Sequence, residues 1–451
     1  MKKSQGRLKA EFMAEAEALF DQLMEWDEQT AKPKLTQIEE IVLQLRQRLG
    51  EQMVQAVLAR QENRQPAEKL SCPQCQGELE PKGEKGKRVE SQVGSLQIER
   101  SYYYCPGCRQ GFSPLDQQLQ IWEKHWSEQV AKQAVWLSGL VTYAQAEQIM
   151  REIGRVDISQ SSVWRRVDLW GRRLQAIESL QQAKAYGFEE PQEIDPNRSL
   201  GRMGAAMDGT MVHIREEGWK ELKVGCVFDI AKRRQYDPHT QEVIELGSAI
   251  HNGYVAHLVG PEVFGRKIWV EARQRHWMHA EDSLTMGDGA LWIWNLVSEH
   301  FYASHQLVDW YHATEHLANA AKTLNGEGTP AAQRWYRHWE TKLYQGHVDK
   351  LVQALQSQAE RQPDKAEALR KEAGYFHNNR KRMNYLEMRA EGYPIGSGMV
   401  ESAAKQYKAR FTGPGMRWSR TGIDRLLPVR TAIMSGRFNK MWRLAYNSPP
   451  I

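Results

Sequence analysis

The sequence contains no apolar run that approaches the roughly 18–20 residues of a membrane-spanning helix. Its N-terminus, MKKSQGRLKAEFMAEAEALF, has no apolar stretch ahead of its first acidic residues, so the sequence predicts no signal peptide. Neither sign of charge dominates, because the formal net charge of the 451-residue chain is only +5. With 41% hydrophobic and 26% charged residues, the composition is typical of a globular protein of roughly two to four domains. We therefore expect a cytoplasmic protein without membrane partners.

Cysteine is scarce, and its placement is informative. Four of the five cysteines form two pairs, Cys72 with Cys75 and Cys105 with Cys108, and the fifth stands alone in an apolar, strand-like segment. Without a secretory signal, such pairs indicate a metal site rather than disulfides. Tetrahedral zinc needs four converging thiolates, which two such pairs supply. The sequence therefore predicts a structural Zn²⁺ ribbon over residues 65–114, with four reduced thiols as the alternative.

Residues 1–64 precede the cysteine pairs and have the periodicity of helices. Apolar residues recur at helical spacing between Ile38 and Val57. This segment could form a helical hairpin or an arm that joins two copies of the chain. It could equally be a packed helical cover for the remaining residues, and the sequence leaves these alternatives open.

Residues 115–180 predict a helix-turn-helix. Two helical patterns are joined by GRVDIS, in which Gly154 can end the first helix and Ser159 can cap the second. Apolar residues of the second pattern would face inward. Its basic face is typical of a helix that enters the major groove of DNA, and an ordinary helical pair is the alternative. The arginines expected on the outer face, in contact with DNA, are Arg165, Arg166, Arg172 and Arg173.

The periodicity changes from about residue 200. RMGAAMDGTMVHI, KELKVGCVFDI and GYVAHLVG predict three successive strands, and SLTMGDGA and SHQLVDW each predict a strand followed by a helix. Three strands in a meander followed by alternating strands and helices indicate one mixed α/β sheet. We expect residues 200–324 to form the first part of this core. Residues 325–392 predict a helical region that interrupts it, and residues 393–451 its last helix and a basic C-terminal region.

Three acidic residues stand where strands end or helices begin. Asp208 falls late in the first of these strands, Asp288 ends a later strand, and Glu401 lies in the first turn of a helix. In an α/β sheet such positions can converge on one cleft. Three neighbouring carboxylates stay ionised only around a cation, and oxygen ligands suit Mg²⁺ or Mn²⁺. A purely structural role is the alternative for each residue, because Asp-Gly is a common turn pair and the helix dipole favours a glutamate in the first turn.

The chain is locally basic at its C-terminal end. Between Glu401 and Arg443 there are ten lysines or arginines against two acidic residues. Such an excess suits a polyanion such as nucleic acid, although a solvated basic tail is the alternative. Lys405 and Lys408 follow Glu401 by one and two helical turns, and with Arg410 they are expected to contact DNA phosphates.

Five segments together carry a family resemblance: AAMDGTMVHI, WKELKVGCVFD, MGDGALWIWN, VDWYHATEHL and YPIGSGMVESAAKQYKARFTGPGMRWS. They resemble the DDE transposases of bacterial insertion sequences, most of all the Kra-type group and more distantly the Mutator-like enzymes, over about residues 200–445. The resemblance implies a ribonuclease H-like core with a helical insertion before the last acidic residue. It also implies a catalytic triad of Asp208, Asp288 and Glu401 around two Mg²⁺ or Mn²⁺ ions.

The resemblance also implies roles for residues near the triad. Asp309 and His312 match the Asp-x-x-His signature that follows the second catalytic aspartate in such enzymes. From the residues alone, they could position DNA, support the metal site or pair for structural reasons, and Asp309 is the main rival to Asp288 as a triad member. Trp335, in the helical insertion, could stack on a flipped or terminal base or simply pack between helices.

These features predict a bacterial, nucleoid-associated DNA transposase. It would bind terminal inverted repeats, cleave the element ends and join the freed 3′-hydroxyl to target DNA, as a homodimer or higher oligomer. Two alternatives remain at this stage. One is a nuclease or resolvase on the same fold, which cuts without joining, and the other is a non-catalytic DNA-binding regulator derived from a transposase.

Overall fold

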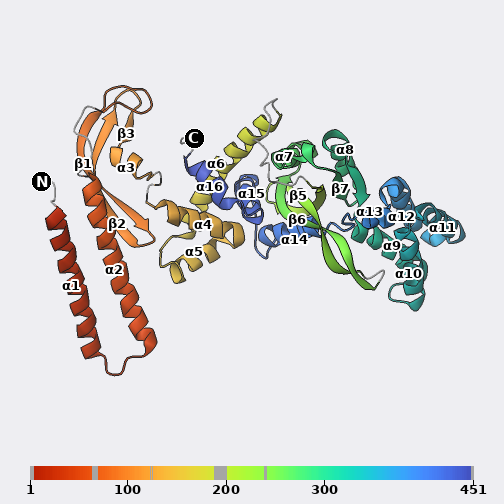
Figure 1. The fold of residues 1–451 in the computed structure, drawn as a ribbon, viewed down its shortest axis with the longest axis horizontal. Helices are drawn as coiled ribbons and strands as arrows, with labels where there is room; N and C mark the ends of the chain where they lie inside the picture. The colour runs from red at the N-terminus through yellow and green to blue at the C-terminus, as the bar shows by residue number, and fades with distance from the viewer. Residues whose placement is uncertain are drawn as a thin grey trace. The chain divides into compact units, whose positions relative to one another are not determined.

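The computed structural model describes residues 5–62, 70–121, 123, 125–186, 201–237 and 241–447. The chain divides into two compact units, Met1–Arg166 and Val167–Ile451 (Figure 1). Within the described ranges, no helix has both the length and the apolar character needed to cross a membrane.

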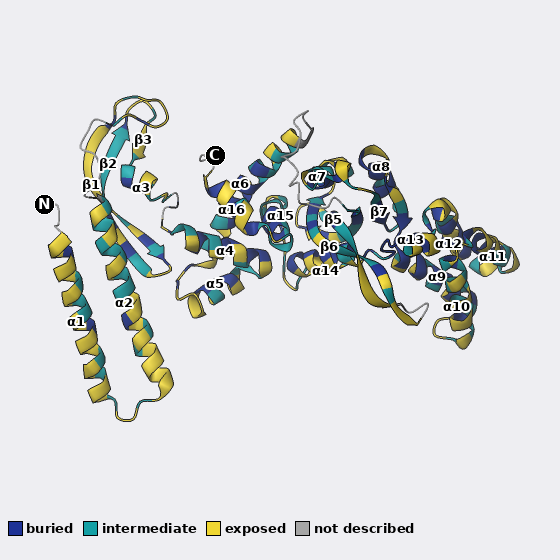
Figure 2. Ribbon diagram, viewed as in Figure 1, coloured by how far each residue is buried: buried dark blue, intermediate teal, exposed yellow. Residues whose placement is uncertain are grey.

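The first unit begins with a helical hairpin. Helices α1 (Gln5–Gln29) and α2 (Leu35–Glu62) pack against each other, and Arg48 binds Glu15 across them at 3.1 Å. Most of the hairpin surface is exposed (Figure 2). The exposed apolar side chains on the two helices are Met13, Phe20, Met24, Leu35, Ile38, Val42, Met53 and Val57. The hairpin was one of the structures that the sequence allowed. Its apolar stripe is covered only in part, because Leu45 is buried whereas Ile38, Val42, Met53 and Val57 are exposed.

A three-stranded antiparallel sheet follows, in the order β1-β2-β3. Its small core is formed by Val89, Leu96, Ile98 and Leu115. The strand bounds are β1 (Glu80–Ser91), β2 (Gly94–Cys105) and β3 (Gln110–Phe112).

Four helices follow the sheet, and the last and longest of them continues from the first unit into the second. Their bounds are α3 (Pro114–Gln118), α4 (Glu128–Leu140), α5 (Tyr143–Glu152) and α6 (Gln160–Tyr186). Helix α5 begins with a capping box between Thr142 and Gln145. The Ser159 hydroxyl accepts a hydrogen bond from the Ser162 amide at 3.4 Å at the start of α6, so the predicted cap is present. The inward positions Val163 and Leu174 are buried, as the helical period predicts.

The second unit is built on a five-stranded sheet in the order β6-β5-β4-β7-β8. The sheet is mixed, because β4 pairs antiparallel with β5 and β5 with β6, whereas β4–β7 and β7–β8 are parallel. This confirms the mixed α/β sheet expected from the strand pattern. The strand bounds are β4 (Met203–Ile214), β5 (Gly218–Asp237), β6 (Glu242–Leu258), β7 (Ser283–Gly287) and β8 (His305–Val308).

Helices pack against this sheet. Helix α7 contacts β5 and β6, α14 contacts β4 and β5, and α15 contacts β6. The bounds are α7 (Pro261–Gln274), the 3₁₀ turn η1 (Trp277–His279), α8 (Leu291–His300), α9 (Trp310–Asn325), α14 (Gly398–Phe411), α15 (Arg420–Met434) and α16 (Phe438–Asn447).

A purely helical segment lies between α9 and α14 in the chain. Its helices α10 and α12 pack against α9, and α11 packs against α12. Thr329 caps α10 through its hydroxyl, and proline follows at the first helical position, where its missing N–H costs nothing. The bounds are α10 (Pro330–Tyr344), α11 (Val348–Arg361), η2 (Pro363–Lys365), α12 (Ala366–Asn379), η3 (Arg380–Arg382) and α13 (Tyr385–Ala390).

Candidate functional site

The four paired cysteines form one cluster. Their sulfur atoms all lie within 4.8 Å of one another, with Cys72 and Cys108 separated by 3.8 Å and Cys75 and Cys105 by 3.5 Å. None of them forms a disulfide. The cluster could therefore hold a metal ion such as zinc, which four thiolates bind tetrahedrally.

The electrostatics of this cluster also suit a cation. Backbone N–H groups of Cys75 and Gln74 lower the pKa of the Cys72 thiol to about 6. The Cys75 thiol and burial raise the pKa of Cys108 to about 12. One thiolate thus forms readily, but four adjacent thiolates need a bound divalent cation, because the thiolate is the form that binds metal.

Three aspartates follow equivalent positions in neighbouring parallel strands of the sheet. In the parallel registers, Met207 lies beside Gly287 and Gly287 beside Val308. The residues that follow these three positions are Asp208, Asp288 and Asp309. Adjacent strands lie about 4.8 Å apart, and residues at equal register point to the same face of a sheet. The strand ends therefore bring together residues that are distant in the chain.

The charges of other predicted site residues affect the pKa of Asp208. Burial raises the pKa of Asp208 to about 6, against the lowering effect of the Gly209 amide, which donates to Asp208 Oδ1 at 2.7 Å. The charge of His312 also lowers this pKa, whereas the charges of Asp288 and Glu401 add to its rise. The structure thus brings Glu401, in the first turn of α14, into the same group as the two strand-end aspartates.

The carboxylates of Asp208, Asp288 and Glu401 approach one another less closely than the sulfur atoms of the cysteine cluster do. Among the described residues, the cysteine cluster is the only set of three or more potential ligands whose atoms all lie within 4.8 Å. Glu401 instead binds Lys405, with the ammonium nitrogen 2.7 Å from the carboxylate, and its side chain is 39% exposed.

Asp309 has a different environment from Asp208 and Asp288. It is 1% exposed, and its Oδ1 accepts the His312 amide at 2.9 Å, which caps α9. Its Oδ2 accepts the amide of Ser397, at the start of α14. Asp309 therefore joins the first turns of α9 and α14, and both of its oxygens are occupied by backbone donors. Asp288, by contrast, is half-buried.

His312 lies beside Asp208 rather than in a buried pair. Its side chain is 33% exposed, with Nδ1 3.9 Å from Glu315. The next histidine on the helix, His316, is bound by Glu372 at 2.6 Å and stacks on the Tyr375 ring at 3.6 Å between centroids. Of these two histidines, His312 is the one whose charge lowers the pKa of Asp208.

Tyr375 was not anticipated from the sequence. Its hydroxyl donates to the main-chain oxygen of Asp288 at 2.9 Å. Gly289, with a φ of 104°, makes this contact possible, because a Cβ there would lie 2.8 Å from Tyr375 Cε2. Helix α12 of the helical segment therefore supports the turn that carries Asp288. No local signal marks this residue, since 87 positions separate the two partners.

Three arginines that the sequence predicts to contact DNA are largely covered by other parts of the protein rather than exposed. Arg166 binds Glu123 at 2.9 Å with only 12% of its side chain exposed, and Arg173 is buried over the Trp170 ring at 4.7 Å. Arg410 is 3% exposed and lies over the Trp418 ring at 5.2 Å. In each case the guanidinium packs on aromatic or acidic side chains of the protein, which the helical period alone does not reveal.

The remaining predicted contacts are accessible to different degrees. Arg165 and Lys408 are exposed. Arg172 is exposed and binds Asp168 at 2.7 Å. Trp335 is half-buried, with its ring 6.0 Å from that of Trp339 on the same helix.

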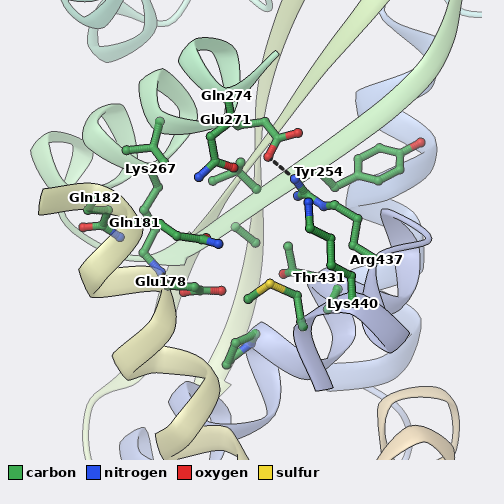
Figure 3. Close-up of a pocket in the computed structure, with 16 residues that line it drawn as sticks. Glu178, Gln181, Gln182, Tyr254, Lys267, Glu271, Gln274, Thr431, Arg437 and Lys440 are labelled. Carbon is green, nitrogen blue, oxygen red and sulfur yellow. Dashed lines mark hydrogen bonds and ion pairs between the residues drawn. The ribbon is translucent and has the colours of Figure 1, made fainter. Parts of the chain in front are cut away.

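A small cavity of about 100 Å³ lies elsewhere in the second unit, lined from α6, β6, α7, α15 and α16 (Figure 3). Two ion pairs line it, Lys267 with Glu178 at 3.0 Å and Arg437 with Glu271. Lys440 adds a further cation to the lining.

Comparison with known proteins does not assign this chain to a family. A scan against protein-family models finds no match, and a search of the curated proteins finds no significant match.

Proposed function

We propose that this protein is a DNA transposase with a ribonuclease H-like core, which binds terminal inverted repeats, cleaves the element ends and joins the 3′-hydroxyl to target DNA. The observation that carries the proposal is the electrostatic grouping of Asp208, Asp288 and Glu401 at the ends of neighbouring parallel strands and the start of α14. The strand order, a three-stranded meander followed by two parallel strands, supports the same fold.

The three carboxylates would hold Mg²⁺ or Mn²⁺. Their oxygen donors fit these ions, and the charges of Asp288 and Glu401 add to the rise in the pKa of Asp208 that burial causes. Two such ions supply activation of the attacking water or hydroxyl and stabilisation of the leaving oxygen. Asp309 would hold the first turns of α9 and α14 together, so that Glu401 faces the aspartates.

Binding of DNA would involve several other parts of the chain. The cysteine cluster, with Zn²⁺ as its metal, and the α5–α6 pair would recognise the repeats, and exposed Arg165 and Lys408 would contact phosphates. The exposed apolar stripe of the α1–α2 hairpin would join two copies of the chain, because two element ends must be processed together.

The proposal is tested with the DNA that flanks the gene as substrate. In Mg²⁺, the wild-type protein should cleave at the boundary of the terminal repeats and produce molecules in which the new 3′ ends are joined to target DNA. Products resolved on denaturing gels should be absent in EDTA. Cleavage without joining would favour a resolvase-like nuclease, and binding without cleavage would favour a regulator, so either result contradicts the transposase assignment.

The contact between Tyr375 and Asp288 predicts a change in metal dependence. Tyr375→Phe removes the hydroxyl that holds the Asp288 main chain but leaves the ring on His316. We expect the Mg²⁺ concentration for half-maximal cleavage to rise roughly tenfold, as for lost supporting contacts around metal ligands. DNA affinity should be unchanged. Tyr302→Phe, at a tyrosine that is 74% exposed, is the control, and an unchanged Mg²⁺ curve for Tyr375→Phe would refute the supporting role.

A further inference from the structure

A cavity of about 450 Å³ lies in the second unit, beside the edge strand β8. Its walls come from His305 and the next residue of β8, the end of α12, all of η3 and part of α13. The three residues of η3, Arg380, Lys381 and Arg382, all line it. We call this space the η3 pocket. Its lining contains none of the residues to which a role in DNA or metal binding is assigned above.

The lining of the η3 pocket is cationic. Besides the three basic residues of η3, it contains one histidine and three amide side chains, and none of the lining residues is acidic. Two carboxylates reach it from outside, because Asp282 pairs with the lining histidine at 3.1 Å and Asp349 lies 3.9 Å from Arg380. Within the described part of the chain, Lys381 and Arg382 form no ion pair. The η3 pocket therefore carries positive charge that an anionic ligand would balance.

Arg382 is held in one orientation by its surroundings. Its Nε donates to Gln306 Oε1 at 2.8 Å, and its guanidinium lies over the ring of Trp294, in α8, at 4.4 Å. Partial burial lowers the pKa of Arg382, but an arginine remains charged at neutral pH. A guanidinium that is already stacked and bonded at Nε loses little conformational freedom when its other nitrogens bind an anion. Such a planar fork matches the oxygens of a phosphate.

The lining favours a phosphate of a nucleic-acid backbone over a free nucleotide. Met388 is the one apolar side chain among the lining residues, and it is only 2% exposed. The nearby Trp294 ring is covered by Arg382. A base would therefore find no free ring on which to stack. Arginine, lysine and amide side chains are the usual partners of the phosphates and sugars of a DNA strand.

The η3 pocket is connected to the predicted carboxylate site by β8 and α12. Strand β8 begins in the wall of the η3 pocket and ends directly before Asp309, so about 13 Å of strand separates the two, at 3.3 Å per residue. Asn379 precedes Arg380, and its side-chain nitrogen would lie 3.1 Å from a Cβ at Gly289, in the turn that carries Asp288. DNA rises about 3.4 Å per base pair, so 13 Å corresponds to about four nucleotides.

We propose that the η3 pocket binds one phosphate of the DNA backbone, about four nucleotides from the phosphate at Asp208, Asp288 and Glu401, with the guanidinium of Arg382 as its principal contact. This inference rests on the proposed function, since it takes DNA as the substrate. It adds a phosphate-binding site on β8 and η3 that is separate from Lys408 on α14 and from the α5–α6 pair.

The first experiment measures DNA affinity with protein variants. Arg382→Gln should raise the Kd for the flanking-DNA duplex, in Ca²⁺ to prevent cleavage, about 10- to 150-fold, as expected when a hydrogen-bonded charge is removed. The slope of log Kd against log salt should fall by about 1. Lys381→Gln, at an exposed side chain whose loss does not disturb packing, should weaken binding to a smaller extent. Arg361→Gln, at an exposed arginine of α11 outside the η3 pocket, is the control and should have no effect.

The second experiment locates the phosphate. The duplex is prepared with one uncharged methylphosphonate linkage, placed in turn at each position on both sides of the cleaved phosphate. At the linkage that the η3 pocket binds, the wild type should lose as much affinity as Arg382→Gln does, and the variant should lose no more. At all other linkages, the two proteins should respond alike. Calorimetry with inorganic phosphate then tests a free anion as the ligand, and only weak binding is expected.

The outcomes separate this inference from the proposed function. If the wild type binds and cleaves the duplex, but Arg382→Gln and Lys381→Gln bind it equally well with the same salt dependence, the phosphate site is wrong and the transposase proposal stands. Tight binding of inorganic phosphate, combined with unchanged DNA affinity of the variants, has the same meaning. If the wild type binds the duplex through Arg382 but does not cleave it in Mg²⁺, the transposase proposal fails and the phosphate site stands. If the wild type does not bind the duplex, both fail.

Discussion

Asp208→Asn is expected to abolish Mg²⁺-dependent DNA cleavage while making the metal-free protein more stable. Loss of an essential group of this kind lowers rates by roughly 10³-fold or more. Asparagine keeps the shape of the side chain and the Oδ1 that accepts the Gly209 amide, but it lacks the charge that would hold a cation. The catalytic loss should be measured as single-turnover cleavage at saturating Mg²⁺.

The gain in stability follows from the pKa of Asp208. Because burial raises that pKa from 3.8 to about 6, the folded protein binds this proton more tightly than the unfolded chain does. The contribution of Asp208 to the free energy of unfolding is therefore most favourable below pH 3.8 and is lost as the pH rises towards 6. At pH 8 in EDTA, the substitution should raise the free energy of unfolding by up to about 3 kcal/mol, and below about pH 4 it should give no gain.

The control for this prediction is Asp349→Asn. Asp349 is 78% exposed, so its substitution changes the same charge without relieving a buried carboxylate. It should alter neither cleavage nor the pH dependence of stability, measured by urea unfolding at pH 4 and pH 8. A destabilised Asp208→Asn protein at pH 8, or one that still cleaves at the wild-type rate, would contradict the assigned environment of Asp208.

The second large effect is expected at the cysteine cluster. Cys75→Ser removes one of four sulfurs and should reduce bound zinc from one ion per chain to well below one, measured by elemental analysis after dialysis. The three-stranded sheet has only a small apolar core, so the metal should supply most of its stability. Structural zinc contributes about 10–16 kcal/mol to the folding of small zinc domains. Loss of the ion should unfold the ribbon and expose it to limited proteolysis.

Cys226→Ser provides the matched control. Cys226 is completely buried in β5, outside the cluster, so its replacement should leave the zinc content unchanged. A wild-type protein without bound zinc, or a Cys75→Ser protein that keeps its full complement, would show that the cluster does not hold this metal. Binding of the flanking-DNA duplex should fall in parallel with zinc if the ribbon recognises the terminal repeats.

Local patterns predicted much of the secondary structure and one site. The spacing of Cys72, Cys75, Cys105 and Cys108 was enough to predict a four-sulfur cluster, because each pair is joined by a short turn and a hairpin brings the two turns together. Ser159 marked the start of α6 for an equally local reason, since a cap depends on residues within one turn.

Side-chain surroundings were predicted less well. Helical period placed Arg166 and Arg173 on an outer face, yet one binds Glu123 and the other covers Trp170. Arg410 is likewise buried, against Trp418. The helical period describes a single helix, whereas the burial of its side chains depends on which parts of the protein that helix packs against. Long side chains with a charged end can also lie along apolar surfaces.

The sequence by itself determined the cysteine cluster, the strand and helix pattern and the candidate carboxylates, because these depend on residue type and short-range spacing. The tertiary structure alone decided that Asp309 joins α9 to α14 through His312 and Ser397, and that Tyr375 supports the turn at Asp288. It also placed Glu401 within electrostatic range of Asp208 and in contact with Lys405. These contacts link residues of separate strands and helices, and their partners are chosen by strand order and helix packing rather than by sequence spacing.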